Sequence, residues 1–501
     1  MGVKITIQDL MTRSGVKFGT SGARGLATQM TDRVCYAYTR GFLQYLRQVG
    51  DWAGKGAVAV AGDLRPSTER IMAAVCRAVE DAGGVSVHCG RVPSPAVALK
   101  GFAERIPSIM VTGSHIPAER NGIKFNKCSG EVLKSDEAGM AAQSIELDES
   151  LFDESGALRP GRGENRPVED RARTSYVRRY LNFFGPDALT GWRVGAYQHS
   201  AVGRELLVEV LAGLGAEVTP LGRSEVFVPV DTEALRPEDV RLAREWSARH
   251  HFDAIVSTDG DGDRPLLADE RGEWLRGDMV GILCARFLGA DSVSTPVSSN
   301  TALEKSGWFR EILRTRIGSP YVVASMQQAL SRGVGVVVGY EANGGFLLGS
   351  AVRDRARGVE LAPLPTRDAL LPILACLVGA RRDGRTLAQS VGALPQRFTA
   401  SSLLKDFPNE HGQAVVRLFQ REGEAAAARH FGDRFGPLAT LDLTDGPRMT
   451  FASGEIVHLR PSGNAPEFRC YSESSSAAQA EQNCREALAI LQNTVVPEAL
   501  G

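Results

Sequence analysis

Several features that mark other protein classes are missing from this sequence. No apolar run approaches the roughly 20 residues of a membrane-spanning helix, and the first residues lack the hydrophobic stretch of a secretion signal. The 58 lysines and arginines nearly balance the 59 aspartates and glutamates, which argues against a general nucleic-acid or membrane-surface binder. The eight cysteines include no Cys-x-x-Cys pair, so neither a zinc site nor a disulfide framework is indicated. We therefore expect a cytoplasmic protein that holds any anionic ligand by local positive charge.

Strand-like and helix-like stretches alternate through most of the 501 residues, which predicts an α/β fold with largely parallel sheets. A short strand, a polar turn and a helix start recur after Val58, Val194 and Val293. A later strand in each of these three units runs into a different polar loop, near Gly113 in the first and Asp259 in the second. Residue-level similarity among the units is too low to establish a repeat, so the recurrence is one of order and character.

Length and composition also divide the chain into domains. A chain of this length exceeds what a single core supports, so three or four domains are expected. Composition shifts place them at 1–165, 166–270, 271–385 and 386–501, the last being a smaller α+β domain.

The stretch Asp259–Arg264 reads Asp-Gly-Asp-Gly-Asp-Arg and is typical of a site for a hard divalent cation. Carboxylate oxygens suit Mg²⁺ or Ca²⁺, and the glycines let the loop curl so that all three carboxylates face one point. The preceding residues 252–258 read as a buried strand, and open α/β sheets bind ligands beyond the carboxyl ends of such strands. The sequence therefore predicts a metal site formed by Asp259, Asp261 and Asp263.

An EF-hand loop and a solvated acidic turn are alternative interpretations of the same stretch. The three aspartates and Glu270 match four ligand positions of the EF-hand pattern. Against it, Arg264 stands where the sharp turn needs glycine, Pro265 follows, and the preceding segment reads as a strand rather than a helix.

Residues 111–125 place a hydroxyl, an imidazole and a lysine in one short stretch. Ser114 is the natural nucleophile or phosphate carrier, because a phosphoserine adds three acceptor oxygens that would suit a nearby metal. His115 or Lys124 could then move protons. A Ser-His pair by itself is more often an ordinary turn.

Two further loops suit a sugar phosphate. Glu341 and Asn343 follow a strand and offer an acceptor and an amide for sugar hydroxyls, although a glycine-rich turn is an equal alternative. Residues 460–469 read Arg-Pro-Ser-Gly-Asn-Ala-Pro-Glu-Phe-Arg, a suitable nest for a phosphate or a plain turn with solvated arginines. The candidate phosphate ligands in this stretch are Arg460, Ser462, Gly463, Asn464 and Arg469.

Taken in order, these loops and the stretch Phe18–Gly25, which reads Phe-Gly-Thr-Ser-Gly-Ala-Arg-Gly, resemble the α-D-phosphohexomutase superfamily, most closely its phosphomannomutase and phosphoglucomutase branch. The resemblance spans nearly the whole chain. It implies three related mixed α/β domains and a smaller C-terminal domain around a central cleft.

The resemblance also implies a role for each candidate residue. Mg²⁺ would bind the three aspartates and a phosphate oxygen on Ser114, and hexose 1,6-bisphosphate would be the intermediate and activator. Phosphoryl transfer would be assisted by Lys124 as general base and by Arg24, His115 and Arg264. The substrate would be a hexose phosphate, Glu341 would bind its 3- and 4-hydroxyls, and the protein would be a monomer or homodimer.

Interconversion of mannose 6-phosphate and mannose 1-phosphate is the function that the resemblance favours. Phosphoglucomutase or dual-specificity activity stays open, because mannose and glucose share the hydroxyls that Glu341 would bind. Phosphoglucosamine mutase, a metal-dependent sugar phosphatase and a non-catalytic binding protein are the remaining alternatives.

The sequence departs from the usual family pattern in three loops. Ile116 replaces a common asparagine, Asn343 and Gly345 replace the serine and histidine of Glu-x-Ser-Gly-His, and Asn464-Ala465 replaces Thr-Glu.

Overall fold

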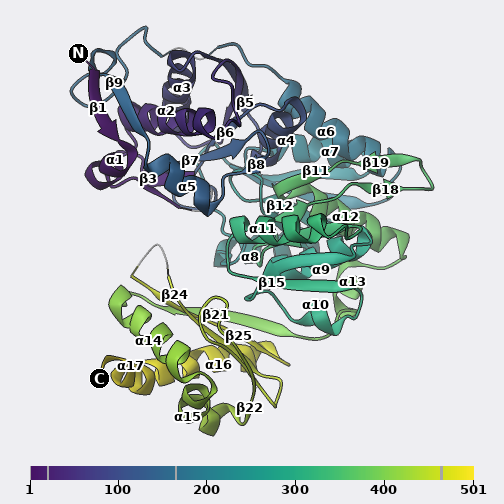
Figure 1. Cartoon of the computed structure of the whole chain (residues 1–501). Coiled ribbons are helices and arrows are strands. Elements are labelled where there is room, and N and C mark those ends of the chain that lie inside the picture. The colour runs from purple at the N-terminus through teal and green to yellow at the C-terminus, as the bar shows by residue number, and fades with distance from the viewer. Residues whose placement is uncertain (1, 20–21, 164–165, 463–465) are drawn as a thin grey trace.

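The computed structural model describes residues 2–19, 22–163, 166–462 and 466–501 (Figure 1). Four main sheets with flanking helices define domains I to IV in chain order, and domains I and IV lie at opposite ends of the molecule. No helix in the described ranges is both long and apolar enough to cross a membrane.

Domain I is built on a mixed sheet with strand order β2-β3-β7-β6-β4-β5, in which β8 also pairs with β7. The strands β1 and β9 form a separate antiparallel pair. The elements of this domain are β1 (Gly2–Thr6), α1 (Ile7–Ser14), β2 (Lys17–Phe18), β3 (Gly22–Leu26), α2 (Asp32–Gln48), β4 (Gly56–Gly62), α3 (Thr68–Asp81), β5 (Gly84–Arg91), α4 (Ser94–Glu104), β6 (Ser108–Val111), β7 (Arg120–Lys127), β8 (Gly130–Glu131), α5 (Lys134–Ala141) and β9 (Ser144–Asp148).

Domains II and III each contain one further mixed sheet, with strand orders β11-β10-β12-β13 and β15-β14-β16-β17-β20. Domain II comprises α6 (Arg171–Phe184), β10 (Arg193–His199), α7 (Arg204–Gly213), β11 (Glu217–Arg223), α8 (Pro237–His250), β12 (Ala254–Thr258) and β13 (Pro265–Ala268). Domain III comprises α9 (Gly277–Phe287), β14 (Ser292–Pro296), α10 (Ala302–Lys305), β15 (Glu311–Thr315), α11 (Ser319–Ser331), β16 (Val337–Tyr340), β17 (Phe346–Leu348), β18 (Val352–Asp354), β19 (Val359–Leu361), β20 (Leu364–Asp368), α12 (Leu370–Arg382) and α13 (Leu387–Gly392).

Domain IV has a fully antiparallel sheet, ordered β21-β25-β24-β23-β22, covered by helices. Its elements are β21 (Phe398–Leu404), α14 (Asn409–Glu422), α15 (Glu424–Phe435), β22 (Leu438–Asp442), β23 (Arg448–Phe451), β24 (Ile456–Pro461), β25 (Phe468–Ser474), α16 (Ala477–Ile490) and α17 (Val496–Leu500). This domain agrees with the expected α+β domain at the end of the chain.

The first three domains share one strand arrangement. In each, four strands that follow one another along the chain share a pattern: the first (β4, β10 or β14) lies centrally and pairs in parallel with the second (β5, β11 or β15) and the third (β6, β12 or β16). The third pairs antiparallel with the fourth (β7, β13 or β17). The predicted threefold recurrence is therefore present. The sheets are mixed rather than largely parallel, because the fourth strand returns directly after each functional loop.

The hydrophobic core explains how the domains are joined. One large cluster of buried residues runs through domains I, II and III, from Ala59 to Leu394. Domain IV has its own cluster, from Phe407 to Val495. Domains I to III therefore share apolar packing, whereas domain IV is a separately packed body.

Polar contacts join domain IV to domain III. Asn300 Nδ2 donates to the carbonyl oxygen of Arg397 at 2.8 Å, and Glu473 accepts from both the amide and the hydroxyl of Thr301. Among the described residues, hydrogen bonds but no common core cluster link these two domains, which is the kind of boundary at which one domain can move against another.

Candidate active site

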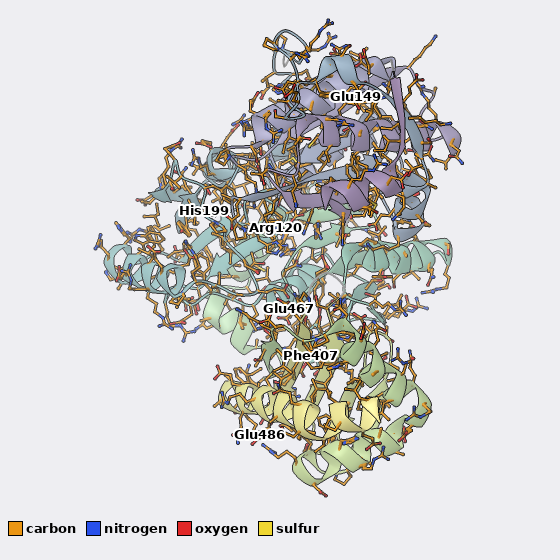
Figure 2. All side chains as sticks on the ribbon, turned by 90° about the vertical axis from the view of Figure 1, so that its left-hand side faces the viewer. Arg120, Glu149, His199, Phe407, Glu467 and Glu486 are labelled. Atoms are coloured by element: carbon orange, nitrogen blue, oxygen red, sulfur yellow. The ribbon has the colours of Figure 1, made fainter. Side chains whose placement is uncertain are left out.

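In each of the first three domains, the third strand of the shared four-strand pattern (β6, β12 or β16) ends in a loop that carries candidate residues. The Ser114 loop (residues 112–119) follows β6, the Asp loop (259–264) follows β12, and the Glu341 loop (341–345) follows β16. In Figure 2 the labelled Arg120, which follows the Ser114 loop, lies near the border of domain I with the middle domains. The labelled Glu467 lies near the border between domains III and IV.

The Asp loop brings its three carboxylates together as predicted. Asp259, Asp261 and Asp263 are buried, and each offers an oxygen atom within 4.8 Å of the others. The Oδ1 atoms of Asp261 and Asp263 are buried without a hydrogen-bond partner among the described residues. Because unpaired buried carboxylate oxygens are costly and are the donors that Mg²⁺ prefers, this cluster fits a divalent cation.

The structure explains why glycine stands at both positions between the aspartates of the Asp loop. Gly262 has a φ of +73°, in the left-handed region that favours glycine. A Cβ at Gly260 would lie 2.7 Å from the carbonyl oxygen of Ser114 and 3.1 Å from Cζ of Phe227. The Asp-Gly alternation therefore lets the metal loop and the Ser114 loop approach each other closely.

Ser114 lies directly against the carboxylate cluster. The side chain of Ser114 is buried, and its hydroxyl donates to Asp259 Oδ2 at 2.7 Å. Nδ1 of His115 lies 3.3 Å from Ser114 Oγ. Ser114 has a φ of +56°, a strained conformation for a residue with a Cβ, and its amide donates to Thr112 Oγ1 at 2.8 Å. The loop thus holds one hydroxyl at the predicted metal site.

Lys124, on β7, bridges two carboxylates of the cluster. Its ammonium donates to Asp261 Oδ2 at 2.5 Å and to Asp263 Oδ2 at 2.6 Å. Lys124 lies opposite Gly22 in the β3–β7 pairing, two residues from Arg24, so Arg24 and Lys124 share a face of the sheet. Two of the predicted catalytic cations therefore come from one face of the domain I sheet.

The buried charges change the pKa values of the cluster in opposite directions. Burial and the negative charges of its two neighbours raise the pKa of Asp259 well above its ordinary value. Burial also opposes ionisation of Asp263, but the positive charges of Arg367, Lys124 and Arg264 hold its pKa well below the ordinary value. A bound cation would stabilise the ionised form of Asp259 most, because its pKa is the one that burial and neighbouring carboxylates raise.

His115 adjoins Ser114, and Arg264 lies beside the carboxylate cluster. Burial and the charges of Arg264 and Arg24 lower the pKa of His115 to about 2, so its imidazole is neutral at neutral pH. Arg264 has a buried Nε without a hydrogen bond among the described residues, 4.0 Å from Asp259 Oδ2 and 3.8 Å from Asp263 Oδ1. An unpaired buried guanidinium N–H beside the carboxylate that accepts from the Ser114 hydroxyl suits an incoming phosphate oxygen.

One arginine connects the Glu341 loop to the carboxylate cluster. Glu341 is buried, and its Oε2 accepts from Arg367 Nη1 at 3.2 Å, while Arg367 Nε donates to Asp263 Oδ2 at 3.1 Å. Asn343 uses its amide oxygen within the loop, accepting from the amide of Gly345 at 2.9 Å. The structure thus joins Glu341 to the metal loop, whereas the oxygen of Asn343 is already engaged.

The predicted phosphate residues lie on the β24–β25 hairpin of domain IV. Arg460 and Arg469 face each other directly in the strand register, and like charges so placed are unfavourable unless an anion or carboxylates lie between them. Arg460 pairs with Asp445 at 2.8 Å, Arg469 pairs with Glu467 at 3.3 Å, and the amide of Ser462 donates to the carbonyl oxygen of Glu467. The predicted ligands Gly463 and Asn464 lie outside the described residues.

A small pocket, with a cavity volume of about 30 Å³, lies between this domain and the sugar loop. Its lining includes Arg276 and Ala342, the latter adjacent to Glu341, and Tyr471 and His458 of domain IV. The space between domains III and IV therefore opens beside Glu341.

Sequence reasoning missed two arginines that organise the site. Arg65, fully buried, donates to the carbonyl oxygens of Ser114 (2.9 Å), Ile116 (2.5 Å), Pro117 (2.7 Å) and Arg120 (3.0 Å). The sequence showed its segment, Ala-Gly-Asp-Leu-Arg-Pro-Ser, only as a strand and a turn. The second is Arg367, for which the sequence carries no local signal, because its partners are distant along the chain.

Comparison with known proteins agrees with this geometry. Models of phosphoglucomutase/phosphomannomutase alpha/beta/alpha domains I, II and III match residues 15–150, 174–272 and 276–398. A crystal structure of a phosphoglucomutase/phosphomannomutase family protein from Burkholderia thailandensis superimposes with a TM-score of 0.72 at 18% identity, covering 95% of this chain and 97% of that one. That likeness concerns the fold.

Curated relatives are similar over nearly their whole length. Phosphomannomutase from Sinorhizobium fredii is 42% identical over 96% of this chain and all of its own. Phosphomannomutase from Salmonella muenchen is 42% identical over 94% of this chain and 95% of its own, and phosphoglucosamine mutase from Thermotoga sp. is 26% identical over 95% and 99%. The chain belongs to the phosphoglucomutase/phosphomannomutase family.

Proposed function

We propose that this protein is a phosphomannomutase that interconverts mannose 6-phosphate and mannose 1-phosphate, with Ser114 as the phosphate carrier. The observation that carries the proposal is the 2.7 Å hydrogen bond between the Ser114 hydroxyl and Asp259 inside a buried cluster of three carboxylates. The 42% identity to two phosphomannomutases supports mannose phosphates as the substrates.

The proposed reaction moves the phosphoryl group between Ser114 and two sugar oxygens. The bond from phosphorus to Ser114 Oγ breaks as a bond to the sugar oxygen forms, and the proton of that sugar hydroxyl passes to a base. Lys124 is the proposed base, and neutral His115, 3.3 Å from Oγ, is placed to assist. The product of this step is a hexose 1,6-bisphosphate, whose other phosphate then returns to Ser114.

Mg²⁺ bound by the three aspartates would supply charge neutralisation at the transferring phosphoryl group. The protein's own cations act at the same place. Arg264 offers an unpaired N–H beside Ser114, and Arg24 adds a second guanidinium on the strand next to Lys124. Such positioning and charge stabilisation are what phosphoryl transfer requires.

The other two loops would bind the parts of the substrate that lie away from the transferring phosphoryl group. Glu341 would accept hydrogen bonds from the 3- and 4-hydroxyls of the sugar. Arg460, Ser462 and Arg469, with Gly463 and Asn464, would hold the phosphate that is not transferred. Two phosphate sites are what a reorienting bisphosphate needs, and they favour a mutase over a phosphatase.

One experiment separates these functions. We would measure isomerisation of mannose 1-phosphate and glucose 1-phosphate side by side, with Mg²⁺ and a trace of hexose 1,6-bisphosphate, while following released inorganic phosphate. Clear preference for mannose supports a phosphomannomutase, and comparable rates indicate a dual-specificity enzyme. Phosphate release without isomerisation would replace the proposal with a phosphatase.

A further inference from the structure

Gly345 leaves space in the Glu341 loop that another side chain fills. A Cβ at this position would lie 2.8 Å from Cδ and 2.9 Å from Cγ of Arg367, on β20. Unlike Gly344, whose φ is +88°, Gly345 is not in the left-handed region. The backbone therefore accepts other residues here, and the glycine matters because it makes room for the arginine.

Arg367 uses that room to join two loops. It is 4% exposed, and its guanidinium donates to Asp263 of the Asp loop and to Glu341 of the sugar loop. Among the described residues this is the only side-chain hydrogen bond that Glu341 makes, and it engages Oε2 alone. The second carboxylate oxygen, Oε1, is left for another donor.

The charge of Arg367 is required at this position. A buried carboxylate without a cation or hydrogen-bond donor is strongly disfavoured, and Glu341 has no other cation within ion-pair distance in the described part of the chain. Asp263, by contrast, also pairs with Lys124. Loss of the guanidinium would therefore affect Glu341 more than Asp263.

We propose that Arg367, in the space that Gly345 leaves, is a positioning residue for sugar recognition: it fixes the Glu341 carboxylate so that Oε1 faces the sugar hydroxyls. This inference rests on the proposed function, because it assigns the sugar to Glu341. In this chain a side chain from β20 supplies a cation to a loop in which glycine stands at the family's histidine position.

A double-mutant cycle tests the proposal. Arg367→Ala removes the guanidinium, and Gly345→Ala keeps it but pushes it away from Glu341. Each variant is expected to raise the KM for mannose 1-phosphate about 10- to 100-fold, the effect of losing a hydrogen bond to a charged group, with a smaller change in kcat. The double variant should be no worse than Arg367→Ala, because the atoms that collide with the new Cβ are gone. Arg367→Lys should recover part of the loss.

Controls separate a structural effect from this one. Arg353→Ala removes an exposed arginine of the same domain, which pairs with Glu360, and Gly392→Ala adds a Cβ where nothing lies within 4 Å. Both should behave as the wild type. The proposal would be overturned if the effects of the two substitutions on KM were additive, that is, if Gly345→Ala raised the KM as much in the Arg367→Ala background as in the wild type.

The proposed function and this inference fail in different ways. Absence of wild-type turnover with mannose phosphates would refute the function. Calorimetry gives the affinity of each variant for mannose 1-phosphate, and from these affinities the coupling between positions 345 and 367. Melting temperatures of the same variants report any loss of stability. Equal mannose 1-phosphate affinity in the wild type and Arg367→Ala, or a lowered melting temperature that accounts for all of the loss, would refute the inference alone.

Discussion

Replacement of Arg65 by methionine tests whether a buried guanidinium holds the Ser114 loop in its strained conformation. The side chain of Arg65 has no solvent exposure and forms an ion pair with Asp63 at 3.1 Å. It also donates to three carbonyl oxygens of the Ser114 loop and to that of Arg120, which follows the loop. Its guanidinium also stacks on the ring of Phe227 in domain II, 4.1 Å from the centroid. Methionine keeps part of the length and apolar volume but supplies no donor.

The expected cost follows from what is left behind. Removing one partner of a buried ion pair costs about 3–5 kcal/mol, because the remaining charge and the carbonyl oxygens lose their partners. Domain I also has a core cluster of its own, from Ile5 to Phe152. For a folding unit of about 150 residues, each kcal/mol lowers Tm by about 2–4 °C, so the domain I transition should fall by about 6–20 °C. The population of the Ser114 conformation with positive φ should fall with it.

Differential scanning calorimetry gives the stability, and intact-protein mass spectrometry after incubation with hexose 1,6-bisphosphate gives the fraction of phosphorylated Ser114. The matched control is Arg353→Met, which breaks an exposed pair with Glu360 and should cost at most about 1 kcal/mol. If Arg65→Met melts as the control does and is phosphorylated to the wild-type extent, the reasoning is wrong.

Four further predictions follow from the site and from domain IV. Ser114→Ala should abolish isomerisation and phosphoenzyme formation, as measured by coupled assay and intact mass. Asp261→Asn should remove Mg²⁺ dependence together with activity, a loss of about a thousandfold, and EDTA should do the same to the wild type. Arg460→Ala should raise the KM for mannose 1-phosphate about 10- to 100-fold, because it removes a charged hydrogen-bond donor. Burial lowers the pKa of His458 from 6.5 to about 4, so the contribution of neutral His458 to folding stability is complete above pH 6.5 and is lost as the pH falls toward 4. Acid titration of the free energy of unfolding should show this loss, and the loss should be smaller in His458→Gln.

Each of these predictions has a clear opposite. Full turnover without the serine hydroxyl would exclude the phosphoserine mechanism, and metal-independent activity would remove the role of the Asp loop. Equal loss for Arg460→Ala with a substrate that lacks the distal phosphate would count against phosphate binding there. An unchanged acid profile in His458→Gln would show that other groups control the acid stability of domain IV.

Much of the site was predictable because its chemistry lies in short segments. Three aspartates on alternate residues can converge only if the loop curls, and Gly262 allows that curl, whereas Gly260 leaves room for the Ser114 loop. The order of strands and polar loops also predicted three related units, because the period of each element is a local property. The approach of Ser114 to Asp259, 145 residues away, was expected from the family resemblance and is present.

Other features depend on contacts between distant segments. Arg367 meets Asp263, 104 residues earlier, and lies in space that Gly345 leaves, and no periodicity or motif around it indicates either contact. Arg65 shows the same limit, since its partners are backbone carbonyl oxygens, which every sequence supplies. The sequence by itself therefore determined which loops carry the carboxylates, the hydroxyl and the cations, because local residue types set that chemistry. Only the tertiary structure decided which cation meets which carboxylate, because that pairing depends on how separate strands and domains pack.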